Sequence, residues 1–106
     1  MTLAPGDIHL IRAQWRRSQD LRPCVVVHID NNKQRVLVSL ISSAADLFDS
    51  HRHFRIPIED IDFKMSGLRK TSYCDDEFRE VRIESLGRRL GCLQGDLAAR
   101  FREWAG

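Results

Sequence analysis

The chain has 106 residues, of which 42% are hydrophobic and 30% are charged, and its formal net charge is only +2. This length and apolar content predict one folded domain, residues 1–106, and exclude a disordered polypeptide. No apolar run approaches the roughly 18 residues that a membrane-spanning helix needs, and the N-terminal residues lack the pattern of a secretory signal.

The cysteines and the basic residues bear on location and ligand. Cys24, Cys74 and Cys92 are odd in number and have no CxxC spacing. This argues against a disulfide framework or a zinc site and predicts a cytoplasmic protein. Only three of the 17 basic residues are lysines. Arginine matches phosphate groups and stacks on bases, although a GC-rich genome would produce the same bias.

The first half of the chain predicts three strands. Residues 7–12 follow a Pro-Gly turn and alternate in hydrophobicity, as a strand does. The polar, aperiodic residues 14–22 predict a loop. Pro23 opens a second strand, whose β-branched run CVVVHID indicates burial on both faces. Residues 30–33 predict a hairpin turn, and residues 35–41 a third strand that pairs antiparallel with the second.

The middle of the chain predicts shorter elements. Ser42 and Ser43 are typical helix-capping residues, and one or two helical turns are expected over residues 44–49. The alternation of residues 53–58 predicts a fourth strand. The residues expected to face inward are Phe54, Ile56 and Ile58, and those expected to face outward are His53 and Arg55.

The last third of the chain predicts more strand and one helix. Residues 59–64 suit a short strand or a turn, and residues 72–74 and 78–84 suit strands interrupted by three acidic residues. Residues 86–91 predict a basic turn that leads into a helix over residues 94–105. The apolar face of that helix is formed by Leu93, Leu97, Phe101 and Trp104. These elements together predict a mostly β fold, a small antiparallel barrel covered by the helix.

Two clusters are candidates for binding. Trp15, Arg16 and Arg17 combine an aromatic ring and two cations in the first loop, which suits base stacking and phosphate binding. A tryptophan folded back over the barrel would account for them equally well. His51 and His53 share one side of a strand, but no third metal ligand stands near them in the sequence, so no metal site is predicted. The cysteines suit buried apolar positions better than a nucleophilic role.

Three segments resemble the PemK/MazF family of toxin endoribonucleases. Gly6-Asp7-Ile8 is similar to the start of the first strand in that family. Arg22-Pro23 before an apolar strand, with Leu40 to Ser43 at the end of the next strand, is similar to a second family segment. Residues 76–79 (DEFR) and 86–91 (LGRRLG) are similar to a third. The segments occur in the family order and span nearly the whole chain.

The resemblance implies an SH3-like barrel of about five to seven short strands with a C-terminal helix, acting as a homodimer. It implies cleavage of single-stranded RNA without metal or cofactor, by attack of a ribose 2′-OH on the adjacent phosphate. It also implies neutralisation by an antitoxin protein, with which the toxin binds DNA. The implied catalytic residues are Arg22, Ser42 and Asp76, with Asp75 as the alternative if the register slips by one residue. The residues expected to bind RNA are Trp15, Arg16, Arg17, His53, Arg55 and Arg79.

Two departures from the family pattern leave alternatives open. Residues 18–21 (SQDL) replace a family pattern that contains glycine, and Glu77 stands where glutamine is usual. The protein could therefore be a weakened barrel that binds RNA or protein without cleaving it. A third reading is a toxin that poisons a topoisomerase, for which the sequence offers little support. Asp76 and Arg79 are expected to form one wall of an RNA groove.

Overall fold

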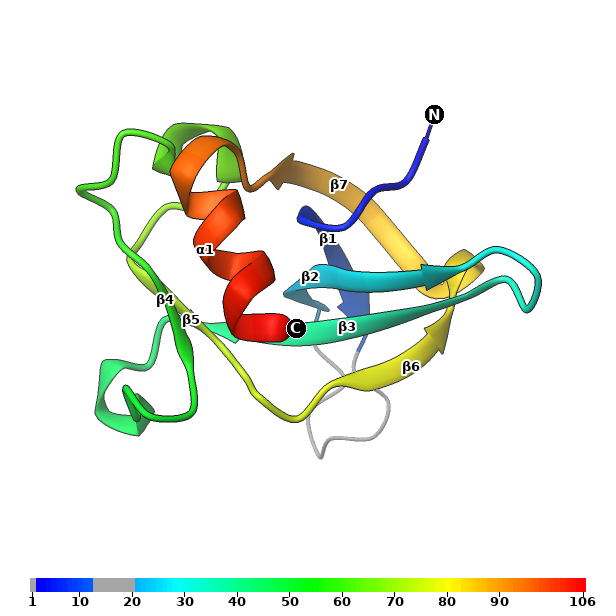
Figure 1. Ribbon diagram of the computed structural model, residues 1–106, viewed down its shortest axis with the longest axis horizontal. Coiled ribbons are helices and arrows are strands. Elements are labelled where there is room, and N and C mark those ends of the chain that lie inside the picture. Colours follow the sequence, from blue (N-terminus) through cyan, green and yellow to red (C-terminus); the bar gives the residue numbers. More distant parts are fainter. Residues whose placement is uncertain (1, 13–20) are drawn as a thin grey trace.

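The computed structural model describes residues 2–12 and 21–106, and this part of the chain forms a curved antiparallel sheet with one α-helix (Figure 1). The strands are β1 (Asp7–Arg12), β2 (Leu21–Asp30), β3 (Arg35–Ser42), β4 (Phe54–Ile56), β5 (Ser72–Cys74), β6 (Arg79–Arg82) and β7 (Leu86–Cys92), and the helix is α1 (Gly95–Ala105). Three short 3₁₀ helices, η1 (Ala45–Leu47), η2 (Phe63–Ser66) and η3 (Ile83–Ser85), lie in the connections. The predicted mostly β, barrel-like fold with a C-terminal helix is confirmed. No helix in the described ranges is long and apolar enough to cross a membrane.

The sheet is organised around β3. Its strand order is β4-β5-β3-β2-β1-β7, every pairing is antiparallel, and the path does not close on itself. One edge of β3 pairs with β2, while the other edge is shared: β6 pairs with its first half and β5 with its last two residues. The segment between β5 and β6 therefore crosses the edge of β3 near its middle.

Both faces of the curved sheet bury apolar side chains, as the β-branched run in β2 predicts. One cluster lies under α1 and is formed by Ile8, Val25, Ile41, Phe54, Ile56, Phe63, Cys74, Leu93, Leu97 and Phe101. A smaller cluster on the other face is formed by Ile11, Cys24, Val36, Val38 and Leu40. Figure 1 shows α1 lying against the sheet, and the predicted apolar helix face is confirmed because Leu97 and Phe101 are fully buried.

Three sequence predictions need correction. β2 begins at Leu21 and not at Pro23, because residues 21–23 already pair with β1. Pro23 is tolerated there because the ladder to β3 begins only at Cys24. Ile58 is half-exposed and not inward, because β4 ends at Ile56 and Pro57 follows. The helical residues after Ser43 amount to one 3₁₀ turn.

The fourth correction concerns residues 86–91, which form most of strand β7 and not a turn. β7 pairs with β1 on one side, and the backbone of Gly91 lies against that of Met65 and Ser66 in η2. A Cβ atom on Gly91 would collide with the Met65 carbonyl. The glycine therefore permits close packing of two backbones, where the sequence suggested a turn.

Candidate functional site

Four neighbouring strands bring three of the predicted site residues, Arg22, Ser42 and Arg55, to one face of the sheet. Ser42 of β3 pairs with Tyr73 of β5, and Tyr73 pairs with Arg55 of β4. The β2–β3 ladder begins with Cys24 opposite Leu40, and Arg22 and Ser42 each lie two residues beyond this pair, so alternation puts them on the same face. Directly paired residues share a face of the sheet. The face is therefore a product of register and not of nearness in sequence.

A pocket of about 120 Å³ opens on this face. A single water needs only about 10–15 Å³ by a comparable measure, so the pocket has room for a small group such as a phosphate. The lining residues are Arg22, Leu40, Ile41, Ser42, Ala44, Leu47, Phe48, His53, Tyr73, Cys74 and Asp75. Among the described residues, the pocket thus combines one cation, a serine and a tyrosine hydroxyl, one imidazole and one carboxyl group.

Arg22 is the cation of the pocket. It lies in β2 opposite Ile11 of β1 and is partly buried. Among the described residues, no ion pair or hydrogen bond joins its guanidinium to a carboxylate. The same side chain lines an adjoining open cleft, where Arg69 and Lys70 add positive charge. An arginine without a carboxylate partner beside a pocket is available to bind a phosphate.

Ser42 supplies the aliphatic hydroxyl of the pocket. It is the last residue of β3, and its Oγ accepts a hydrogen bond from the backbone N–H of Ala44 at 3.1 Å. Accepting this bond orients the oxygen while leaving the hydroxyl hydrogen available to donate. The serine therefore ends the strand and presents a donor beside Arg22.

Asp75 is held at the point where the chain crosses from β5 to β6. Its backbone N–H donates to the Leu40 carbonyl at 3.0 Å, and Ser39 Oγ donates to its carbonyl at 2.6 Å. Its Oδ1 accepts the backbone N–H of Glu77 at 3.0 Å. The buried middle of β3 thus fixes the position of this carboxyl group beside the pocket.

Asp76 is placed differently from its neighbour. It is exposed, and Arg52 binds it with two hydrogen bonds, Nε to Oδ2 at 3.2 Å and Nη2 to Oδ1 at 2.9 Å. This contact holds the pKa of the Asp76 carboxyl below its usual range. Asp76 is not among the pocket-lining residues. Of the two alternatives that the sequence left open, the structure brings Asp75 to Arg22 and Ser42.

The remaining residues expected to bind RNA have separate positions. Trp15, Arg16 and Arg17 lie outside the described residues. Arg55 is exposed on the face of Ser42 and Tyr73 and pairs with Glu59 at 3.0 Å. Arg79 begins β6, with Glu77 at 3.9 Å, and does not line the pocket. Neither Asp76 nor Arg79 therefore forms a wall of this pocket.

Some pocket residues were missed by sequence reasoning. Phe48 packs on Tyr73 with ring centroids 4.5 Å apart and lines the pocket with it. Tyr73 could have been found because it alternates with Asp75 along the chain. Arg69 and Lys70 carried no distinguishing signal, because their nearness to Arg22 depends on how the segment from η2 to β5 folds back.

The cysteines behave as buried apolar residues. Cys24 and Cys74 are both fully buried. Burial raises the pKa of the Cys24 thiol to about 12 and raises the pKa of Cys74 as well. Burial is enough to explain why the Cys74 thiol resists ionisation, without a contribution from the neighbouring carboxylates. Neither thiol is therefore suited to nucleophilic attack.

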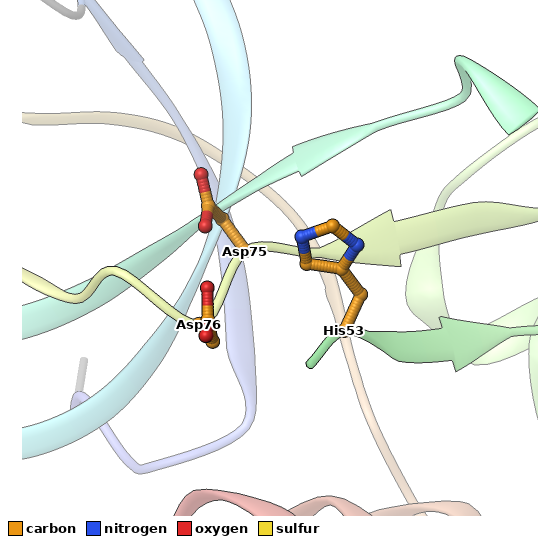
Figure 2. Close-up of side chains that lie close together, drawn as sticks. All are labelled: His53, Asp75 and Asp76. Atoms are coloured by element: carbon orange, nitrogen blue, oxygen red, sulfur yellow. The ribbon is translucent and has the colours of Figure 1, made fainter. Parts of the chain in front are cut away.

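One group of side chains has the composition of a metal site. Ligand atoms of His53, Asp75 and Asp76 lie within 4.8 Å of one another (Figure 2). No third ligand stands near His53 in the sequence because the two aspartates follow β5, on the other side of a long connection. However, Arg52 already neutralises Asp76. The chemistry of this donor set is therefore that of an ion-paired carboxylate beside a second carboxylate and an imidazole.

Comparison with known proteins supports the fold. No protein-family model matches the sequence, and no curated protein matches it. Among solved structures, the Mycobacterium tuberculosis toxin MazF-mt6 is similar, with a TM-score of 0.68 and 18% sequence identity. The match covers 97% of this chain and 93% of that chain. The chain therefore has a MazF-like fold over nearly its whole length.

Proposed function

We propose that the protein is a toxin-type endoribonuclease that cleaves single-stranded RNA without a metal ion. The observation that carries this proposal is the meeting of Arg22, Ser42 and Asp75 at one phosphate-sized pocket. The fold shared with a MazF toxin supports it. Arg22 lies in β2, Ser42 ends β3 and Asp75 directly follows β5, so their convergence is a property of the folded sheet.

In the proposed reaction, the ribose 2′-oxygen attacks the adjacent phosphorus and the bond from phosphorus to the 5′ oxygen breaks. Asp75 accepts the proton of the 2′-OH, the leaving 5′ oxygen takes a proton from water, and the hydroxide that remains takes the proton from Asp75 and restores its carboxylate. The products are a 2′,3′-cyclic phosphate and a 5′-hydroxyl end. RNA supplies the nucleophile, so no activated serine or cysteine is needed.

Arg22 and Ser42 stabilise the charge that develops on the phosphate. Arginine remains protonated in proteins, so Arg22 acts as a donor to the non-bridging oxygens and not as a base. Ser42 adds a neutral hydroxyl donor. Donors aimed at the developing charge in a partly enclosed site are among the largest contributions to catalysis. We further propose that the protein is a cytoplasmic homodimer. An antitoxin protein neutralises it, and the complex of the two binds DNA.

The test is direct mapping of RNA ends. Purified protein is incubated with unstructured RNA in the presence of a chelator, and the new ends are sequenced after chemistry specific for 5′-hydroxyl groups. We expect discrete cleavage sites, and Arg22→Ala should lower the cleavage rate by about 100-fold, the scale of losing one transition-state donor.

The matched control is Arg82→Ala. Arg82 is exposed in β6 beside Glu84, at the opposite end of β3 from Ser42, and its loss should leave the rate unchanged. RNA that stays intact but forms a tight complex weakened by salt would instead identify an RNA-binding module. If the protein neither cleaved nor bound RNA, both readings would be refuted.

A further inference from the structure

The ring of His53 is fixed by the loop that precedes it. The backbone N–H of Asp49 donates a hydrogen bond to His53 Nδ1 at 3.0 Å. In return, the Asp49 carbonyl accepts the backbone N–H groups of Arg52 at 3.0 Å and His53 at 2.8 Å. The loop from residue 49 to residue 53 therefore closes on itself around the imidazole.

This arrangement determines where the ring carries its proton. A nitrogen that accepts a hydrogen bond from a backbone N–H must present a lone pair. A neutral imidazole has one N–H and one lone pair. Because Nδ1 accepts the Asp49 N–H, the neutral ring carries its proton on Nε2.

The protonated nitrogen points into the candidate site. Figure 2 shows the imidazole with one nitrogen turned toward the carboxyl groups of Asp75 and Asp76 and the other turned away. With Nδ1 bound to Asp49, the nitrogen that faces the carboxyl groups is Nε2. His53 lines the same pocket as Arg22 and Ser42. The pocket therefore has an imidazole N–H donor beside the arginine and the serine.

We propose that His53 binds the RNA phosphate as a neutral N–H donor and is a further catalytic residue of the site, an inference that rests on the proposed function. Its Nε2–H donates to a phosphate oxygen as negative charge develops there. The ring transfers no proton, because Nε2 already carries its only hydrogen and Nδ1 is occupied by the Asp49 N–H. A metal ion on Nε2 would require a proton on Nδ1, which would then face that N–H.

Two substitutions separate this role from proton transfer. A glutamine amide can place an N–H group near the position of Nε2, whereas an asparagine amide is too short and reaches only the region of Nδ1. We expect His53→Gln to keep the cleavage rate within about 10-fold and His53→Asn to lose about 100-fold, as for removal of one oxyanion donor. His51→Gln is the control, because the side chain of His51 is exposed and, within the described part of the chain, its hydrogen bond to Asp49 Oδ1 is made by the backbone N–H.

Equal losses in His53→Gln and His53→Asn, with both variants folded by circular dichroism, would overturn the proposal in favour of proton transfer. Activity that disappears with chelator and returns with a divalent cation would overturn it in favour of a metal ligand. Cleavage retained in both variants would overturn it altogether.

A second measurement does not depend on turnover. Long-range proton–nitrogen correlation spectra of the labelled protein should show the Nε2–H form of His53, and the Nδ1–H form would overturn the proposal. A short, fully 2′-O-methylated RNA cannot be cleaved, and it should bind His53→Gln about as well as the unmodified protein and His53→Asn more weakly. If that binding pattern is found in a protein that cleaves no RNA, the proposed cleavage fails while the donor role of His53 stands.

Discussion

Arg52 binds Asp76 through two hydrogen bonds, and its backbone carbonyl accepts the Nε1–H of Trp104 at 3.0 Å. One residue thus joins the loop before β4 to the segment after β5 and to helix α1. Because His53 follows Arg52 and Asp75 precedes Asp76, this ion pair sets the separation of the two pocket residues. Its role is to position the site, although its charges are exposed to solvent.

The pair makes stability depend on pH in a direction that can be worked out. The pKa of Asp76 is lower in the folded protein than in the unfolded chain, with the Arg52 hydrogen bonds as the largest cause. The stabilisation is therefore complete above the ordinary aspartate pKa of about 3.9 and is lost as the pH falls through the lower folded value. Asp76→Asn should be less stable than the unmodified protein at neutral pH, and the difference should vanish in acid.

Urea denaturation at a series of pH values measures this difference. The matched control is Asp96→Asn, which removes an exposed partner of Arg100 on α1, away from the pocket. If the gap between the unmodified protein and Asp76→Asn stayed constant down to the lowest pH, the ion pair would not be its source.

The adjacent aspartates should differ in their effects on activity. Asp75→Asn removes the proposed proton acceptor but keeps an oxygen for the Glu77 N–H, so the fold should survive while cleavage falls by about 100-fold or more. Asp76→Asn should cost less, because Asp76 acts through the position of its neighbours. Single-turnover cleavage rates of the two variants decide the matter, and a larger loss at Asp76 would restore it as the catalytic carboxylate.

Gly91 should tolerate no side chain. A Cβ atom there would collide with the backbone of η2, so Gly91→Ala should lower the free energy of unfolding by about 1–3 kcal/mol, the usual cost of overpacking. Thermal or urea denaturation measures the loss. Arg88 lies in the same strand but is exposed, so Arg88→Ala should change the free energy of unfolding little. If Gly91→Ala had the same free energy of unfolding as the unmodified protein, η2 must be able to move away from β7.

The three cysteines should react with thiol reagents at very different rates. Cys92 is only partly buried, whereas Cys24 and Cys74 are fully buried and have raised pKa values, about 12 for Cys24. Ellman's reagent should therefore modify one thiol quickly in the native protein and all three after denaturation. RNA cleavage should persist after modification of Cys92, which lies outside the pocket. Rapid reaction of two or more thiols would contradict the buried positions.

The parts of the fold that follow from periodicity could be predicted from the sequence. The four-residue recurrence of Leu93, Leu97 and Phe101 predicted α1 and its buried face, and both were found. Alternation likewise predicted β1, and a strand after the hairpin turn was predicted over residues 35–41, which form nearly all of β3. These patterns involve residues that are close together in the sequence, so they can be recognised before any contact is known.

What could not be predicted depends on pairing between distant strands. Asp75 and Asp76 are equivalent in the sequence, and only the pairing of β5 with β3 determines which one lies beside Arg22. Residues 86–91 resembled a turn because two glycines flank arginines, yet the glycines serve close contact with other backbones. The acidic residues near His53, Asp75 and Asp76, were missed for the same reason, since they follow a strand that is distant in the sequence.

Asp75 is attached through its backbone to Ser39 and Leu40, in the most buried part of the sheet. The carboxyl group proposed to accept the proton is thus held by the hydrophobic interior and not only by the surface connections around it. Its position should therefore depend on the packing of β3 more than on the length of those connections. A change in the core of the sheet would reach the pocket through this one peptide.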